Sequence, residues 1–297
     1  MSRAALLFVV AGVVLSRPIT HRTSGLQCKV PPHRAHHSTT VLYFHIFKAA
    51  GTTIREKLRQ YAHACDLRWA CLIDCERKVL GASLVNCKVK DEIHMPRDAN
   101  RRSVLHLNRA DVVGGHLHFG LVEAFPRARL VTLLRDPDSA VVSGIRYVHP
   151  TWKFDHVLAE LRRRARGAPG SARNAVNYLA PPGRNASAAY AAAAANLRRF
   201  DVVGVVENWD ASMRMLQAFL DPTHGWRGWH NDDRRNVHSQ AFSTASVLRQ
   251  LTSTDALCLA AYVSRERALY AAAVAAHRAT CRALLGARDR GCRATID

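Results

Sequence analysis

Three short segments hold side chains that suit phosphate binding and acid–base chemistry. Residues 47–53 (FKAAGTT) place Lys48 in a turn with a glycine and two threonines. Arg135 precedes Ser143 by eight positions, and an arginine fork and a serine hydroxyl can bind the same anion. His116 lies in the segment GHLHFG, and histidine titrates near neutral pH, which suits a general base.

The phosphate-binding segments are expected between strands and helices. Residues 41–46 (VLYFHI) predict a strand, and residues 54–62 have the spacing of an amphipathic helix. Residues 129–134 predict a second strand, which a helix begun by Pro137 follows, and residues 201–220 repeat the pattern. A strand that turns into a helix aims backbone N–H groups and the positive end of the helix dipole at one point. We therefore expect an α/β fold of three layers, with helices on both faces of a central parallel sheet.

The remaining segments are less informative. Residues 162–182 are expected to form a surface insertion, and residues 186–195 an alanine-rich helix. Residues 226–239, rich in glycine, tryptophan, histidine and arginine, are typical of a functional loop. Residues 255–285 have helical periodicity and are expected to close the domain as one or two helices.

Each motif also has a simpler structural interpretation. Lys48 could be a solvated lysine in an ordinary turn, and Arg135 could pair with Asp136 at the surface while Ser143 packs within a helix. His116 could lie at a buried strand end, and His118 is expected to point to the opposite face. The signature GxxxxGK[ST] of nucleotide hydrolases is absent, since the lysine precedes the glycine.

Composition is that of a folded chain, whereas the charge is unusual. The 297 residues are 48% hydrophobic and 22% charged, which excludes an intrinsically disordered chain and a small disulfide scaffold. The 43 lysines and arginines exceed the 23 acidic residues, for a net charge of +20. Such a charge favours nucleic acid, an anionic membrane, a phosphorylated cofactor or an acidic polymer as partner.

The N-terminus predicts entry into the secretory pathway. The uncharged run at residues 4–15 would span only ~18 Å at ~1.5 Å per residue, which is typical of a signal-peptide core. Residues 1–16 are therefore expected to be a cleaved signal peptide or a short membrane signal-anchor. Residues 17–40 are expected to be a stem or linker, and residues 41–297 the folded domain.

The cysteines support the same location. An even number, eight, favours disulfides in a secreted chain, with 105 possible connectivities, and the spacings at 65, 71, 75 and 87 lack a zinc knuckle. Asn185 begins the glycosylation sequon Asn-Ala-Ser.

Five segments, in the same order along the chain, resemble the carbohydrate sulfotransferases of the Golgi and bacterial type, which include the heparan, chondroitin and dermatan sulfotransferases. Residues 44–53 (FHIFKAAGTT) resemble the family's 5′-phosphosulfate loop, and residues 133–143 (LLRDPDSAVVS) resemble its 3′-phosphate motif. Residues 115–121 (GHLHFGL), 203–212 (VGVVENWDAS) and 268–270 (ALY) are similar to three further segments of that family. The match covers roughly residues 41–280.

The resemblance implies a sulfotransferase fold like that of P-loop nucleotide hydrolases and a location in the Golgi lumen or membrane. It implies transfer of a sulfuryl group from 3′-phosphoadenosine 5′-phosphosulfate (PAPS) to a hydroxyl of a carbohydrate, in particular an anionic polysaccharide or glycan. It implies His116 as general base and Lys48 as the residue that neutralises the departing phosphate. The expected cofactor-binding residues are Lys48, Ala49, Ala50, Gly51, Thr52, Thr53, Arg135 and Ser143. No metal and no nucleic acid are expected.

The chain departs from the family pattern at three positions. Ala140 stands where a basic residue is usual, so one positive contact to the cofactor is either missing or supplied from elsewhere. Phe47 and Ala49 replace a common proline and a common threonine. Two alternatives stay open: a catalytically impaired protein that binds anionic polysaccharide through its basic surface, and a divergent P-loop kinase.

Overall fold

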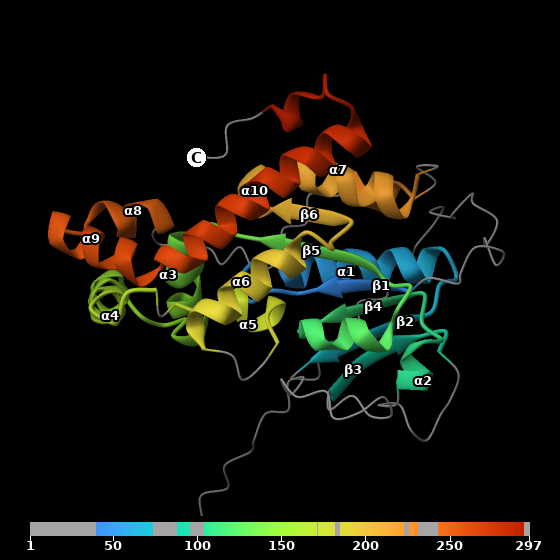
Figure 1. Ribbon diagram of the computed structural model, residues 1–297, viewed down its shortest axis with the longest axis horizontal. Helices are drawn as coiled ribbons and strands as arrows, with labels where there is room; N and C mark the ends of the chain where they lie inside the picture. Colours follow the sequence, from blue (N-terminus) through green and yellow to red (C-terminus); the bar gives the residue numbers. More distant parts are fainter. Residues whose placement is uncertain are drawn as a thin grey trace, which may run out of the picture.

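A six-stranded sheet forms the centre of the molecule in the computed structural model (Figure 1). The structure describes residues 40–73, 88–95, 104–170, 172–181, 185–222, 226–230 and 243–293. The strands are β1 (Val41–Phe44), β2 (Trp69–Ile73), β3 (Lys88–Ile93), β4 (Val112–Gly115), β5 (Arg129–Leu134) and β6 (Val202–Val205). They lie in the order β3-β2-β4-β1-β5-β6, in which β3 pairs antiparallel with β2 and every other pair is parallel.

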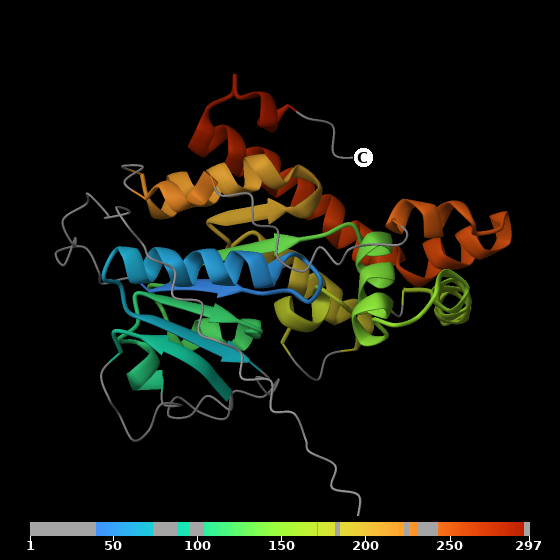
Figure 2. The same ribbon diagram turned by 180° about the vertical axis from the view of Figure 1, so that it is seen from behind.

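Helices cover both faces of the sheet. The helices α1 (Gly51–Ala64) and α7 (Trp209–Leu220) lie on the face turned to the viewer in Figure 2. The opposite face, in front in Figure 1, carries α5 (Val176–Leu179) and α6 (Ala186–Leu197), with α10 (Ser264–Leu285) running along β6. The shorter elements of the sheet domain are α2 (Val104–Leu107), η1 (Phe119–Ala124), η2 (Val206–Asn208), η3 (Arg227–His230) and η4 (Arg290–Cys292).

The alternation of side chains along the strands builds two separate apolar cores. In β1, Leu42 and Phe44 pack into the core beneath η1, α5 and α6, whereas Tyr43 packs with α1 and α7 on the other face. All three side chains are at most 1% exposed. Burial of the strand on both faces explains the unbroken apolar run at residues 41–44.

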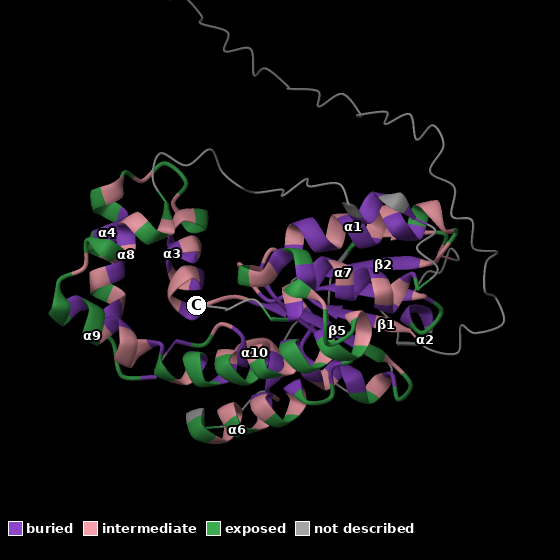
Figure 3. Cartoon of the chain, turned by 90° about the horizontal axis from the view of Figure 1, so that it is seen from above, coloured by how far each residue is buried: buried purple, intermediate pink, exposed green. Residues whose placement is uncertain are grey.

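A helical lobe stands beside the sheet at the left of Figure 3. It consists of α3 (Pro137–Val148), α4 (Phe154–Ala165), α8 (Thr244–Arg249) and α9 (Ser253–Tyr262). The lobe has an apolar core of its own, in which Val142 and Ile145 of α3 meet Leu161 of α4 and Leu259 of α9. The helix α3 therefore joins two bodies, since it begins directly after β5 of the sheet.

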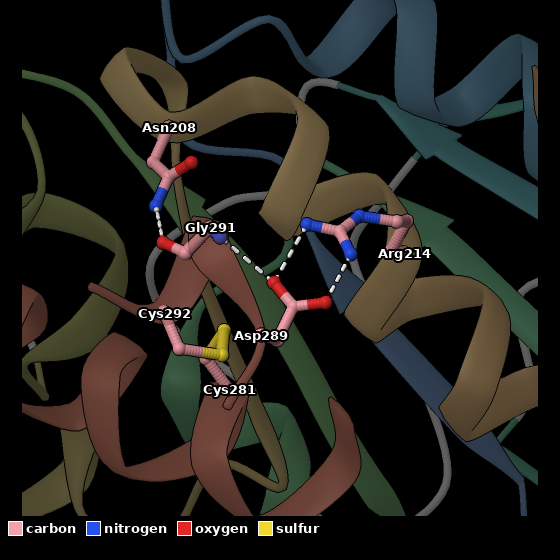
Figure 4. A network of polar contacts seen from close by, with 6 residues as sticks. All are labelled: Asn208, Arg214, Cys281, Asp289, Gly291 and Cys292. Atoms are coloured by element: carbon pink, nitrogen blue, oxygen red, sulfur yellow. Dashed lines mark hydrogen bonds and ion pairs between the residues drawn. A yellow bond between two sulfur atoms is a disulfide. The ribbon is translucent and has the colours of Figure 1, made fainter. Parts of the chain in front are cut away.

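A set of polar contacts, here named the C-terminal clasp, ties the end of the chain to α7 (Figure 4). Cys281 and Cys292 form a disulfide across a separation of 11 residues. Asp289 pairs with Arg214 through both carboxylate oxygens and accepts the Gly291 N–H at 2.8 Å. Asn208 donates to the Gly291 carbonyl at 2.7 Å.

The same three residues, Cys281, Asp289 and Cys292, are the one group of the described residues whose spacing would suit a metal ion. Because both sulfurs are joined in the disulfide, neither is a thiolate ligand.

The α/β class, the largely parallel sheet and the three predicted strand–helix units are confirmed. The predicted alanine-rich helix is α6, and the closing region forms two helices, α9 and α10. One expectation is wrong. The segment at 162–182 is more than a surface insertion, because Val176 and Leu179 of α5 are buried in the core of the sheet.

The described part of the predicted functional loop is also structural. Trp226 and Trp229 are buried and pack on Tyr61 of α1, with ring centroids 5.6 and 5.3 Å away. Residues 231–239 of that loop lie outside the described residues.

Several predictions concern residues that the structure does not describe. The signal segment at 1–16 and residues 17–39 of the stem lie outside it, as do Cys28, Cys75 and Cys87. Cys65 is disulfide-bonded in addition to the clasp pair, while Cys71 and Cys258 are free thiols. Of the helices in the described part of the chain, none has the length and apolar character needed to cross a membrane.

Candidate anion-binding site

The loop between β1 and α1 has a constrained backbone. Lys48 and Ala50 adopt left-handed conformations, with φ of 63° and 56°. This conformation costs a residue other than glycine about 1–2 kcal/mol. Ala50 is the N-cap of α1, and no side chain caps the helix there. The first turn (Gly51, Thr52, Thr53) therefore presents the positive end of the helix dipole without a carboxylate or hydroxyl cap.

Three side chains from separate elements hold the carbonyl groups of this loop. His116, just after β4, contacts the His45 carbonyl through Nδ1 at 2.9 Å. Asn174 donates to the Phe47 carbonyl at 3.0 Å, and Arg135 donates to the Lys48 carbonyl at 3.4 Å. These contacts fix the direction of the loop's carbonyl groups. The N–H groups of the same loop then point away from His116, Asn174 and Arg135.

Gly51 is required by the histidine beside it. A Cβ at this position would lie 1.6 Å from Cδ2 of His45, so a larger residue would displace the imidazole. The His45 ring is 6% exposed and stacks on His116 with the centroids 4.2 Å apart. Burial holds the pKa of His45 well below its usual value, and its Nδ1 has no hydrogen-bond partner among the described residues. This ring is therefore neutral at physiological pH.

Three cations converge on the loop. Burial, together with the charges of Arg135 and Arg146, lowers the pKa of Lys48 to about 8. Its Nζ lies 4.2 Å from the centroid of the Tyr147 ring, a cation–π contact. Like charges brought together in a partly buried place oppose folding unless an anion is bound between them. The sequence singled out Lys48 and Arg135 by their places after strands, whereas Arg146 was one of many basic residues.

Arg135 is positioned from the opposite side by a short polar chain. The Tyr270 hydroxyl donates to Oε2 of Glu207 at 2.6 Å, and Oε1 of Glu207 accepts the Asp136 N–H at 3.1 Å. Asp136 then caps α3 by accepting the Ser139 N–H at 2.8 Å. Burial lowers the pKa of Arg135, and its Nε is buried without a hydrogen-bond partner among the described residues. The guanidinium therefore has one N–H group that the described residues leave without an acceptor.

The histidine segment is arranged differently from an extended strand. The strand β4 ends at Gly115, and the rings of both His116 and His118 stack on Tyr178, with centroids 5.7 and 5.4 Å away. The expectation that these two histidines face opposite sides is wrong, and residues two positions apart in an extended segment would also share one face. His116 Nδ1 carries the proton, because the carbonyl it contacts can only accept. The neutral imidazole then offers Nε2 as the basic atom.

A buried carboxylate holds the segment that carries Tyr178. Glu266 of α10 accepts the Ala175 and Val176 N–H groups at 3.0 and 3.2 Å. It is 4% exposed, and burial raises its pKa to about 7. Asn174 and Tyr178, which flank these amides, both reach the loop and histidines described above. Asn174, Tyr178 and Glu266 were not singled out from the sequence, since their role appears only when α5 and α10 are folded together.

The structure brings together most of the residues that the sequence singled out. Lys48, Gly51, Thr52, Thr53 and Arg135 surround the N-terminus of α1, with Ala49 buried and Ala50 as cap, and His116 borders the same loop. Ser143 is half-buried in the middle of α3, and no hydrogen bond joins its side chain to Arg135, although both are described. The geometry therefore supports an anion-binding role for Ser143 less directly than for the other residues.

Ala140 lies buried in α3, with 6% of its surface exposed. The extra cation of the cluster, Arg146, comes six positions later on the same helix.

The chain matches no family model and no curated protein.

Proposed function

We propose that the chain is a PAPS-dependent carbohydrate sulfotransferase with the fold of the P-loop-like sulfotransferases. The observation that carries the proposal is the convergence of Lys48, Arg135 and Arg146 on the uncapped N-terminus of α1. A nucleotide that bears phosphate groups at both ends of its ribose needs two separate anion sites. The amides and hydroxyls of the loop would hold the 5′-phosphate, while Arg135 and Ser143 would hold the 3′-phosphate.

The transfer step follows from the charges on the two sides of the loop. A carbohydrate hydroxyl oxygen forms a bond to sulfur as the bond between sulfur and the bridging phosphate oxygen breaks. His116 takes the hydroxyl proton at Nε2, and Lys48 neutralises the charge that develops on the departing phosphate. The products are the sulfate ester and adenosine 3′,5′-bisphosphate. Arg146 would supply the positive contact that Ala140 does not provide.

The proposal also includes a cellular location for the chain. The clasp disulfide and the disulfide at Cys65 favour an oxidising compartment, as does the apolar N-terminal run. Asn185 is exposed and caps α6 through its side-chain oxygen, so its amide is accessible for glycosylation. We place the chain in the Golgi lumen or membrane, acting on an anionic polysaccharide or glycan.

The test is calorimetric titration of the purified chain with adenosine 3′,5′-bisphosphate, without added metal. We expect stoichiometric binding by the wild type and at least tenfold weaker binding by Arg135→Ala, because a charge-assisted hydrogen bond is worth about 1.5–3 kcal/mol. Arg282→Ala is the matched control, since Arg282 is exposed at the far end of α10. Absence of binding by the folded wild type, or ATP turnover that requires Mg²⁺, would overturn the proposal. Steeply salt-dependent polysaccharide binding without nucleotide binding would favour the non-catalytic alternative.

A further inference from the structure

Exposed apolar surface is concentrated beside the cation cluster. Tyr147 and Val148 are 52% and 58% exposed, and Leu257 on α9, at 72%, is the third large apolar side chain that is strongly exposed in the described parts of the chain. Tyr147 and Val148 are neighbours at the C-terminal end of α3 and directly follow Arg146. An aromatic ring left open to solvent next to a binding site indicates a contact surface for a ligand.

The loop fixes the position of the Tyr147 ring. Phe47 packs against it edge to face, with the centroids 5.4 Å apart, and Lys48 Nζ lies 4.2 Å from its centroid. The turn that leads into α4 adds a second ring pair, in which His149 and Trp152 stack with centroids 3.6 Å apart and planes 3° from parallel. We name Tyr147, Val148, His149 and Trp152 the α3–α4 strip.

The charges around the strip are mainly positive. Arg146 precedes it, Lys153 follows it, and Lys48 lies against its first ring, while Asp155 is the nearest acidic residue along the chain. A ligand that fits therefore carries negative charge and also presents an apolar face. A sugar ring with a sulfate or carboxylate has both properties, because its C–H groups pack on the negative face of an aromatic ring.

We propose that the α3–α4 strip is a subsite for the acceptor and binds an anionic sugar residue of a polysaccharide. The ring of the sugar lies on Tyr147, and its acidic group lies at Arg146. This inference rests on the proposed function for the identity of the ligand as an acceptor. It assigns acceptor recognition to the helix whose N-terminal end follows Arg135, so that one helix contacts both substrates.

The experiment compares Tyr147→Ala with Tyr147→Phe and with Leu257→Ala, a strongly exposed apolar residue elsewhere in the lobe. Binding of a heparin octasaccharide and of adenosine 3′,5′-bisphosphate is measured by calorimetry for each variant. We expect Tyr147→Ala to bind the octasaccharide about tenfold more weakly and the nucleotide within about threefold of wild type. Tyr147→Phe keeps the ring and should match wild type for both ligands, as should Leu257→Ala.

A second variant, Val148→Asp, places a negative charge in the strip at a solvent-exposed position, and we expect it also to weaken octasaccharide binding. Unchanged octasaccharide binding in both Tyr147→Ala and Val148→Asp would overturn the inference. Loss of nucleotide binding alone in Tyr147→Ala would also overturn it, because the ring would then belong to the nucleotide site. If wild type binds no nucleotide yet the octasaccharide results hold, the proposed function fails while the strip stands as a polysaccharide-binding surface.

Discussion

The C-terminal clasp and the anion-binding site are both polar clusters, but the charges are paired in the clasp and are of one sign in the anion site. In the clasp, Arg214 and Asp289 neutralise each other, and the neighbouring backbone groups are hydrogen-bonded. At the anion site, the pKa of Lys48 is lowered by burial and by two arginines, and Arg135 keeps a buried Nε without a partner in the described structure. The charges of the clasp are paired within the protein, whereas we propose that those of the anion site are paired by a bound ligand.

The difference assigns separate roles to the two regions. Paired groups tied by a disulfide stabilise the folded chain, so changes in the clasp should lower stability and leave ligand affinity unaltered. Like charges held together are a cost to folding that bound anion offsets, so changes at the loop should affect binding and catalysis and leave stability unaltered or improved.

The largest effect is expected from Lys48→Ala. Sulfuryl transfer should fall by about 100-fold to 1,000-fold, because a preorganised positive group no longer stabilises the departing phosphate. The melting temperature should stay the same or rise, since a desolvated cation is removed from beside Arg135 and Arg146. Transfer from PAPS to a polysaccharide and thermal unfolding are measured on the same sample, with Arg282→Ala as control. Full activity in Lys48→Ala would contradict this role for the loop.

The double variant Cys281→Ala, Cys292→Ala changes the clasp and should affect stability rather than binding. The disulfide closes a short loop, and its loss should lower the free energy of unfolding by about 3 kcal/mol. Affinity for adenosine 3′,5′-bisphosphate below the melting transition should equal that of wild type. Denaturant unfolding and calorimetric titration check the two halves of this prediction. A loss of affinity in the folded variant would show that the two regions are coupled.

Glu266→Gln examines the buried carboxyl group that holds the Ala175 and Val176 amides next to the anion site. Its pKa of about 7 in the folded chain is above the ordinary value of 4.5, so folding takes up a proton between these pH values. Its contribution to stability is therefore complete below about pH 4.5 and is lost as the pH rises through about 7. The glutamine variant should lose this part of the pH dependence. The measurement is the free energy of unfolding of both proteins from pH 5 to 8. If this free energy changes with pH equally in both, Glu266 does not contribute to the pH dependence.

The smallest effect expected is the pH dependence of nucleotide affinity. Lys48 has a pKa of about 8 in the free protein, and a bound anion raises it, so binding takes up a proton above about pH 7. Affinity for adenosine 3′,5′-bisphosphate should decline by less than tenfold per pH unit as the pH rises through 8. Lys48→Arg, which stays charged, should show a flatter profile. Calorimetry in buffers of different ionisation enthalpy measures the proton uptake directly.

The sequence predicted the elements that local pattern defines and missed those that depend on distant partners. The strand β1 and the turn after it follow from an apolar run and a glycine within one short segment. The strand β2 and the edge strand β3 were not predicted. Four of the six residues of β3 are charged, and its pairing with β2 appears only in the fold, where Trp69 donates to Asp91 at 3.0 Å.

The same reason limits prediction of the site. Lys48 lies in the turn between β1 and α1, and Arg135 directly follows β5, so both were expected to bind phosphate groups. Asn174 bonds the Phe47 carbonyl across 127 positions of sequence, Tyr178 stacks on His116, and Glu266 holds the amide of Ala175. Nothing in the local sequence of these residues indicates the contacts. His118 was placed wrongly, since residues two positions apart in an extended segment share one face, and both histidine rings stack on Tyr178.

The left-handed conformations of Lys48 and Ala50 bear on the rate of binding as well as its strength. A loop held in a rarely populated backbone shape by contacts from three elements has little freedom to order when a ligand arrives. No closing step of the loop then needs to precede contact with an anion. The association rate is therefore set by diffusion and by attraction to a chain of net charge +20, and it should decrease with ionic strength.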